Sequence, residues 1–293
     1  MELRQLRYLV ALTHELNFTN AAARAHVAQP ALSRQIRKLE DELGVALVDR
    51  TSRRVQMTAA GQRLAQHAQM ILDQVESARA EVAQGTGLTS GRLSIGATQT
   101  PGPLDISGLL TEFHARYPAV ALAVREDLSV AIADRLRSDE LELGFVSELA
   151  PPARHGLELR QIATEPMVIA LPPTHRLAAR AELEFAELDG EPFVLFPEGA
   201  TIRDTADQLF RAHELEAKVA FVTTDTARIC EMVSLGFGVS LLPLSDARRS
   251  AQELATAAVI GEELTYSVHM ARRRSRRQSP AVLAMIDLIE SSF

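Results

Sequence analysis

The stretch that decides the fold is FTNAAARAHVAQPALSRQIRKLEDELGVALVDRTSRR, residues 18–54. An apolar stripe with the period of an α-helix runs through its middle and comprises Leu32, Ile36, Leu39 and Leu43. Gly44 follows the stripe, at a position where helices often end in a left-handed residue. An alanine-rich segment precedes the stripe, and Thr19 is placed to cap a first helix there. The pattern predicts a helix-turn-helix at about residues 18–37.

The face opposite the apolar stripe carries long or hydroxyl-bearing donors, which are Gln29, Ser33, Arg34, Arg37 and Lys38. Side chains of these types reach phosphates and base edges in the major groove of DNA. We predict base-edge contacts for Gln29, Ser33 and Arg34, and phosphate contacts for Arg37 and Lys38. Pro30 and Ala31 are expected to lie against the groove wall or a thymine methyl group.

A basic hairpin is predicted after this helix, at residues 45–57. Arg50, Arg53 and Arg54 lie close to its tip. Like charges this close repel one another, which a hairpin tolerates best when its partner is a polyanion. We expect Arg53 and Arg54 to contact phosphates or the adjacent minor groove, and a solvated loop is the alternative.

This segment resembles the N-terminal domain of the LysR-type transcriptional regulators. The family pattern is close to F-T-x-A-A-x-x-L-x-V-S-Q-P-A-L-S-x-Q-I-x-x-L-E-x-x-L-G-x-x-L-F-x-R. The matching residues are Phe18, Thr19, Ala21, Ala22, Val27, Gln29, Pro30, Ala31, Leu32, Ser33, Gln35, Ile36, Leu39, Glu40, Leu43, Gly44, Leu47 and Arg50. The chain departs from the pattern at Ala25, Ala28 and Val48. Ala28 matters most, because a hydroxyl there would cap the recognition helix and its loss costs about 1 kcal/mol.

A long helix is predicted at residues 59–84, with Thr58 as its cap. A heptad seam runs along it and comprises Leu64, Ala68, Ile71, Val75, Ala78 and Val82. Such a seam requires a partner, and the polar side chains on the other faces favour a second copy of the same helix. Packing on its own domain is the alternative. The resemblance implies the same role, since the family joins its DNA-binding domains through a linker helix; residues 59–90 then form a linker and hinge after a DNA-binding domain at residues 1–58.

From residue 91 onward, short apolar runs alternate with helical segments. Strands are expected at residues 93–96, 120–125, 141–146, 167–171, 193–196, 219–222, 239–242 and 265–270, with helices at 109–117, 130–138, 205–213, 227–235 and 280–291. This rhythm is typical of an open α/β sheet. The resemblance implies an effector domain of the periplasmic-binding-protein (type 2) kind, with subdomain I at residues 91–162 and 266–293 and subdomain II at residues 163–265.

Hydroxyl side chains follow several of the predicted strands. The candidate effector-binding residues are Thr98, Gln99, Thr100, Ser129, Thr201, Ile202, Arg203 and Thr224. In open α/β sheets a ligand binds beyond the strand ends, where helix N-termini point. Hydroxyls with one arginine would suit a small organic anion such as a carboxylate. The alternative is that each threonine caps its helix and that Arg203 is a surface charge.

The composition is that of a globular protein, with 46% hydrophobic and 24% charged residues among 293. No apolar run has transmembrane length, and no signal-peptide core is present near residue 1. Residues 1–90 hold 11 basic and 9 acidic residues, whereas residues 91–293 hold 20 and 29. A single cysteine, Cys230, excludes a disulfide within one chain and fits a reducing cytoplasm.

We therefore expect a cytoplasmic, homo-oligomeric transcription regulator, dimeric or tetrameric, that binds a dyad-symmetric promoter site on double-stranded DNA. A small effector would bind between the two α/β subdomains, and RNA polymerase is a further candidate partner. No metal-ligand spacing, cofactor motif or catalytic motif is found, and no membrane partner is expected. A constitutive DNA-binding or architectural protein without effector is the alternative, and a solute-binding protein or an enzyme fits the sequence less well.

Overall fold

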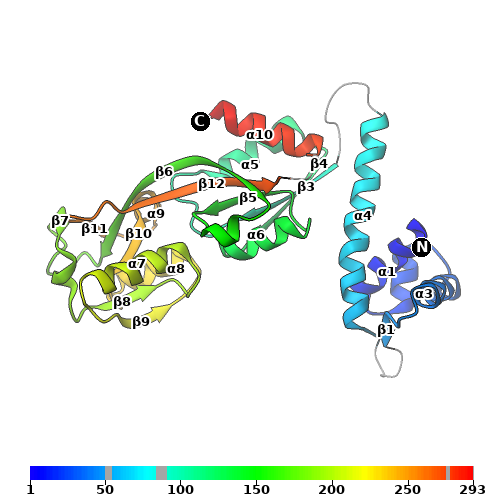
Figure 1. Cartoon of the computed structure of the whole chain (residues 1–293), viewed down its shortest axis with the longest axis horizontal. Coiled ribbons are helices and arrows are strands. Elements are labelled where there is room, and N and C mark those ends of the chain that lie inside the picture. Colours follow the sequence, from blue (N-terminus) through cyan, green and yellow to red (C-terminus); the bar gives the residue numbers. More distant parts are fainter. Residues whose placement is uncertain (50–54, 84–90, 275–277, 293) are drawn as a thin grey trace. The chain divides into compact units, whose positions relative to one another are not determined.

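The computed structural model describes residues 1–49, 55–83, 91–274 and 278–292. Two compact units make up the chain, at residues 1–92 and 93–293 (Figure 1). Arg50, Arg53 and Arg54 of the predicted hairpin tip and residues 84–90 of the predicted hinge lie outside the described residues.

The N-terminal unit is a small helical domain with a two-stranded hairpin. Its elements are α1 (Leu3–Glu15), α2 (Phe18–Arg24), α3 (Gln29–Leu43), β1 (Val48–Asp49), β2 (Gln56–Met57) and α4 (Ala59–Ala83). Strands β1 and β2 pair antiparallel, as a winged helix-turn-helix requires. The core is centred on Leu9 and Leu12 of α1 and on Leu32, Ile36 and Leu39 of α3.

The caps of α2 and α3 show why the turn lies at residues 25–28. Asn17, and not Thr19 as predicted, caps α2, because its side chain accepts hydrogen bonds from the backbone N–H groups of Thr19 and Asn20 at 2.8 and 3.1 Å. Ala28 occupies the N-cap of α3 without a side-chain hydrogen bond, and Gly44 ends α3 with a φ of 67°. The predicted stripe is buried except for Leu43, which is 42% exposed.

The first turns of helix α4 pack on the core of the N-terminal unit. The Thr58 hydroxyl accepts a hydrogen bond from the N–H of Gly61 at 3.0 Å, as a cap should. Leu64 packs on the core and Ala68 is fully buried within this chain, so these two predicted seam positions serve packing inside the domain. Ile71 is 36% exposed. The side chains of Ala78 and Val82 lie outside the described residues.

The C-terminal unit is a curved mixed sheet flanked by helices. Its strands are β3 (Gly91–Ala97), β4 (Val120–Glu126), β5 (Leu143–Ser147), β6 (Leu157–Leu171), β7 (Glu182–Leu183), β8 (Pro192–Leu195), β9 (Lys218–Val222), β10 (Ser240–Pro243), β11 (Ala255–Val259) and β12 (Thr265–Arg273). Its α-helices are α5 (Ile106–Arg116), α6 (Ser129–Arg137), α7 (Thr201–Ala212), α8 (Thr226–Ser234), α9 (Leu244–Arg249) and α10 (Pro280–Ser292). Two 3₁₀ turns, Pro151–Arg154 and Phe185–Leu188, complete the unit.

Strand β6 connects the two halves of this unit (Figure 1). Residues 157–166 of β6 pair with β12 in the sheet β4-β3-β5-β12-β6, and residues 167–171 pair with β10 and β11. Strands β8 and β9 form a separate parallel pair beside α7 and α8. Strand β6 therefore belongs to the sheets of both halves, and it brings residues from the two halves together.

Candidate functional site

Helix α3 separates its apolar and polar side chains as the sequence predicts. Leu32, Ile36 and Leu39 are buried. The residues predicted to contact DNA lie on the other faces: Gln29, Pro30, Arg34, Arg37 and Lys38 are exposed, and Ala31 and Ser33 are half-buried. Within the described ranges no ion pair involves Arg34 or Arg37, so both guanidinium groups are free to bind an anion.

Lys38 differs from the two arginines because it already has a partner. Its Nζ lies 3.2 Å from a carboxylate oxygen of Glu2. The hydrogen bond from Lys38 lowers the pKa of Glu2, and Arg4 contributes to the same effect. The pair is exposed, so its stabilising effect is small and a phosphate can compete for the ammonium group. Arg53 and Arg54, predicted to act with Lys38, lie outside the described residues.

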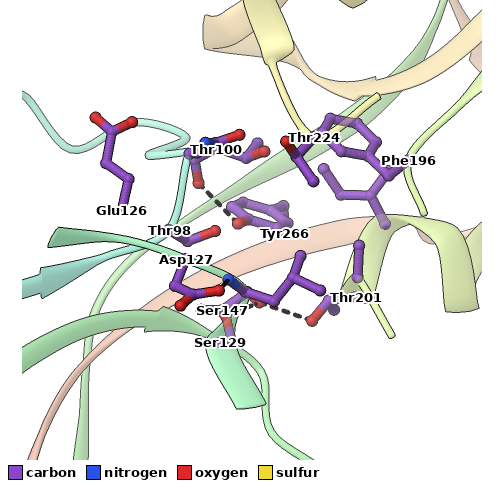
Figure 2. Close-up of a pocket in the computed structure, with 14 residues that line it drawn as sticks. Thr98, Thr100, Glu126, Asp127, Ser129, Ser147, Phe196, Thr201, Thr224 and Tyr266 are labelled. Carbon is purple, nitrogen blue, oxygen red and sulfur yellow. Dashed lines mark hydrogen bonds between the residues drawn. The ribbon is translucent and has the colours of Figure 1, made fainter. Parts of the chain in front are cut away.

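A cavity of about 120 Å³ lies at the strand ends of the C-terminal unit (Figure 2). It is lined by Thr98, Gln99, Thr100, Glu126, Asp127, Leu128, Ser129, Ser147, Phe196, Ala200, Thr201, Ile202, Thr224 and Tyr266. A cavity of roughly 150 Å³ accepts a benzene-sized molecule, so this one suits a small organic compound. The structure brings together seven of the eight residues predicted to bind an effector.

One chain of hydroxyl groups crosses the cavity. The Ser147 hydroxyl lies 2.8 Å from that of Ser129 and 2.7 Å from that of Thr201. Thr201 donates in turn to the backbone carbonyl of Glu148 at 3.1 Å. Because a carbonyl only accepts, the hydroxyl protons run from Ser129 through Ser147 and Thr201 to Glu148. We call these four residues the Ser147 relay; it joins β5 and α6 to α7 (Figure 2).

A second chain crosses nearby. The Thr226 hydroxyl donates to the backbone carbonyl of Gln99 at 3.1 Å and lies 3.1 Å from the hydroxyl of Thr100. Tyr266 donates its phenolic proton to the backbone carbonyl of Thr100 at 2.8 Å. Burial raises the pKa of Tyr266 far above its usual value, so it stays a donor. Thr201 and Thr226 therefore do not cap their helices, which have Ala200 and Asp225 at the N-cap, and instead link the two halves of the C-terminal unit by hydrogen bonds.

Arg203, which was predicted to bind an effector, is not among the lining residues of this cavity. Its guanidinium donates to Asp207 at 2.8 Å and to the backbone carbonyl of Phe196 at 3.3 Å. The reason is helical geometry, since Asp207 follows Arg203 by four residues and lies on the same face of α7. The lining contains two carboxylates, Glu126 and Asp127, and no lysine or arginine from the described part of the chain.

Sequence reasoning missed several lining residues. They are Glu126, Asp127, Leu128, Phe196, Ala200 and Tyr266. Glu126 to Leu128 connect β4 to α6, a strand-to-helix junction of the kind used to select Thr98 and Thr201. Position at the end of a strand, taken without the requirement for a hydroxyl side chain, would have found them. Tyr266 carried no such signal, because it lies near the start of β12.

Two family models match the chain over most of its length. Residues 3–62 match the model "Bacterial regulatory helix-turn-helix protein, lysR family", and residues 86–293 match "LysR substrate binding domain". The chain belongs to the LysR family. It is a DNA-binding transcription regulator with an effector-binding domain, and the recognition helix and the cavity described above fall in the two matched segments.

Relatives and solved structures agree with this assignment. The LysR-type chain is 34% identical over 284 residues to the HTH-type transcriptional regulator YnfL of Escherichia coli (strain K12), covering 96% of this chain and 95% of YnfL. It is 34% identical to the regulator OxyR of the same organism over 243 residues, which cover 83% and 79% of the two chains. Full-length CbnR complexed with its target DNA matches with a TM-score of 0.76 at 26% identity over 100% of both chains. A full-length OxyR variant from Pseudomonas aeruginosa matches with a TM-score of 0.71 at 29% identity, covering 99% of this chain and 95% of the variant.

The single cysteine of this LysR-type protein lies in the C-terminal unit. Cys230 is buried on α8, and burial raises the pKa of its thiol. A raised pKa keeps the thiol protonated and weakly reactive. In the described ranges no cluster of three or more histidine, cysteine, aspartate or glutamate side chains is placed to hold a metal ion. None of the described helices has the length and apolar character needed to cross a membrane.

Proposed function

We propose that α3 enters the major groove of a dyad-symmetric promoter site, where Gln29, Ser33 and Arg34 contact base edges. Arg37, Lys38 and the hairpin residues Arg53 and Arg54 bind phosphates or the adjacent minor groove. The observation that carries this proposal is the exposed, unpaired state of Arg34 on the face of α3 opposite its buried stripe. Because transcription regulators act where the chromosome is, the protein works in the cytoplasm, and it needs no catalytic activity to do so.

Binding titrations on the cognate site and on random DNA test the base contact. Arg34→Ala should lose about 1–3 kcal/mol on the cognate site and less on random DNA. Arg211→Ala is the matched control, because Arg211 is an exposed arginine on α7 and its removal changes the net charge equally. Equal losses on both DNAs would make Arg34 a phosphate contact.

We further propose that the cavity between the two halves of the C-terminal unit binds the effector. Lining residues come from β4, β5, α6, α7 and β12 and from the loops that follow β3, β8 and β9, so a bound molecule would touch both halves at once. Subdomain I comprises residues 91–162 and 266–293, and subdomain II residues 163–265, in this proposal. Occupancy shifts their relative placement, and a regulator without effector would show no ligand-dependent rise in Tm.

We also propose that α4 carries a dimer contact through Ile71 and Val75, the exposed or half-buried members of the predicted seam. Leu64 and Ala68 support α4 on the domain core instead. Two copies of α4 would place two recognition helices on the two halves of a dyad-symmetric site. Tetramers and contacts with RNA polymerase are compatible with this arrangement.

A further inference from the structure

The hydrogen-bonding capacity of the cavity points to the chemical class of its ligand. In the Ser147 relay, every hydroxyl proton is committed along the chain to the carbonyl of Glu148. The Thr226 and Tyr266 protons are likewise committed to backbone carbonyls. The hydroxyl groups of both chains therefore present mainly lone pairs to a guest, which makes them acceptors.

Two further acceptors line the same cavity. Gln99 Oε1 is buried and has no hydrogen-bond partner among the described residues. The Glu126 side chain is exposed at the edge of the cavity, and no ion pair to it is found in the described ranges (Figure 2). Asp127 differs, because Arg135 lies 3.5 Å from its carboxylate and balances the charge. A guest that donates hydrogen bonds and carries positive charge would satisfy Gln99 and Glu126.

Two helices begin at the lining of the same cavity. Leu128 and Ala200 are the N-cap residues of α6 and α7, and neither supplies a side-chain cap. Backbone N–H groups of both first turns therefore lack side-chain acceptors, while Leu128, Ser129, Ala200 and Thr201 all line the cavity. Uncapped helix starts attract a negative group such as a carboxylate.

We propose that the effector is a small zwitterion of the α-amino-acid type. Its ammonium group binds Glu126 and Gln99 Oε1, and its carboxylate binds the first turns of α6 and α7. This assignment rests on the proposed function of the cavity as the effector site. It replaces the simple carboxylate expected from the sequence, because Arg203 is paired with Asp207 and is absent from the lining, whereas the lining carboxylate of Glu126 has no ion pair in the described ranges.

The test measures the Tm of the full-length protein with the protein amino acids at millimolar concentration. Each hit is compared with its two truncated analogues, for example propionate and ethylamine for alanine, or 4-methylpentanoate and isopentylamine for leucine. At least one amino acid should raise the Tm, and both of its analogues should bind about ten-fold more weakly or worse, since a charge-assisted hydrogen bond is lost in each.

Glu126→Gln should remove the preference for the amine while leaving the fold intact, because Glu126 is exposed. Glu216→Gln, an exposed glutamate between α7 and β9, is the matched control and should bind like the wild type. Carboxylic acids that bind as tightly as the amino acids, or a Glu126→Gln variant with unchanged affinities, would overturn the zwitterion while keeping the cavity as effector site. A panel without any hit would overturn the class, whereas DNA footprinting reports on the regulator function separately.

Discussion

The hydroxyl oxygens of Ser147 and Thr201 lie 2.7 Å apart, which links the end of β5 directly to the start of α7. Their hydrogen bond is one of only a few polar links that cross the cavity within the described residues. An effector that enters the cavity must keep this link or replace it. In the proposed function, this contact couples the occupancy of the cavity to the relative placement of the two halves.

Thr201→Val should destabilise the C-terminal unit by about 1–3 kcal/mol, because it leaves the buried Ser147 hydroxyl without its acceptor. Thr205→Val is the control, since the Thr205 hydroxyl bonds only to the backbone carbonyl of Thr201 within α7. Thermal unfolding of the full chain measures both variants. A Thr201→Val variant as stable as Thr205→Val would show that the Ser147 relay does not stabilise the C-terminal unit.

Gly61→Ala should destabilise the N-terminal unit, although the same change stabilises an ordinary helix by about 1 kcal/mol. A Cβ at Gly61 would lie 2.1 Å from the backbone oxygen of Leu47 and 2.9 Å from Cε of Met57. Relieving this overlap costs about 1–3 kcal/mol and displaces the hairpin from α4. Urea titration of the full chain measures the change in the free energy of unfolding, and Ala59→Gly serves as a control for helix propensity. A Gly61→Ala variant more stable than the wild type would contradict the close packing.

Ile71→Asp should shift the protein toward monomers, because it introduces a charge into the proposed α4 seam. Gln66→Asp introduces the same charge on an exposed part of α4 and should leave the assembly unchanged. Sedimentation equilibrium over a range of concentrations measures the association constant. Identical association of both variants would remove α4 from the dimer contact.

Asp246 should make the stability of the C-terminal unit depend on pH. Burial raises the pKa of its carboxyl from 3.8 to about 6, against the opposing effect of Arg249, whose guanidinium lies 2.8 Å away. A raised pKa means that the folded state binds the proton more tightly, so the contribution of Asp246 to stability is largest near pH 4 and is lost as the pH rises to about 6.

Asp246→Asn should remove this dependence and be more stable than the wild type near pH 7, by an amount of the order of 3 kcal/mol at most. The difference in free energy of unfolding between the two proteins, followed from pH 4 to pH 7, isolates Asp246 from the other carboxyls. A difference that does not change with pH would show that Asp246 is already ionised throughout that range.

Much of the fold was predictable because its elements carry local signals. Each of these signals depends on a short segment of sequence: the apolar stripe of α3, the cap at Thr58, and the hydroxyl side chains after strands at Thr98 and Thr201. Strand β11 and helix α9 were not predicted. The run ATAAV of β11 has few β-branched residues, and its pairing with β6 depends on contacts far away in sequence.

The cavity shows a similar division. Residues at strand-to-helix junctions were found by position, whereas Tyr266 and the orientation of Arg203 depend on tertiary contacts. Arg203 is the clearer case, because its guanidinium donates a hydrogen bond to Asp207 at 2.8 Å and does not line the cavity. Residue type alone therefore did not predict the ion pair of Arg203 with Asp207.

The most direct test of the account is a footprint on the DNA upstream of the gene for this protein, with wild type and Arg34→Ala compared at one salt concentration. The account predicts protection of a dyad-symmetric site by the wild type, with protection by Arg34→Ala requiring about 5–150-fold more protein. Weak binding that disappears with added salt and leaves no protected site, on this DNA and on genomic fragments, would contradict sequence-specific recognition by α3.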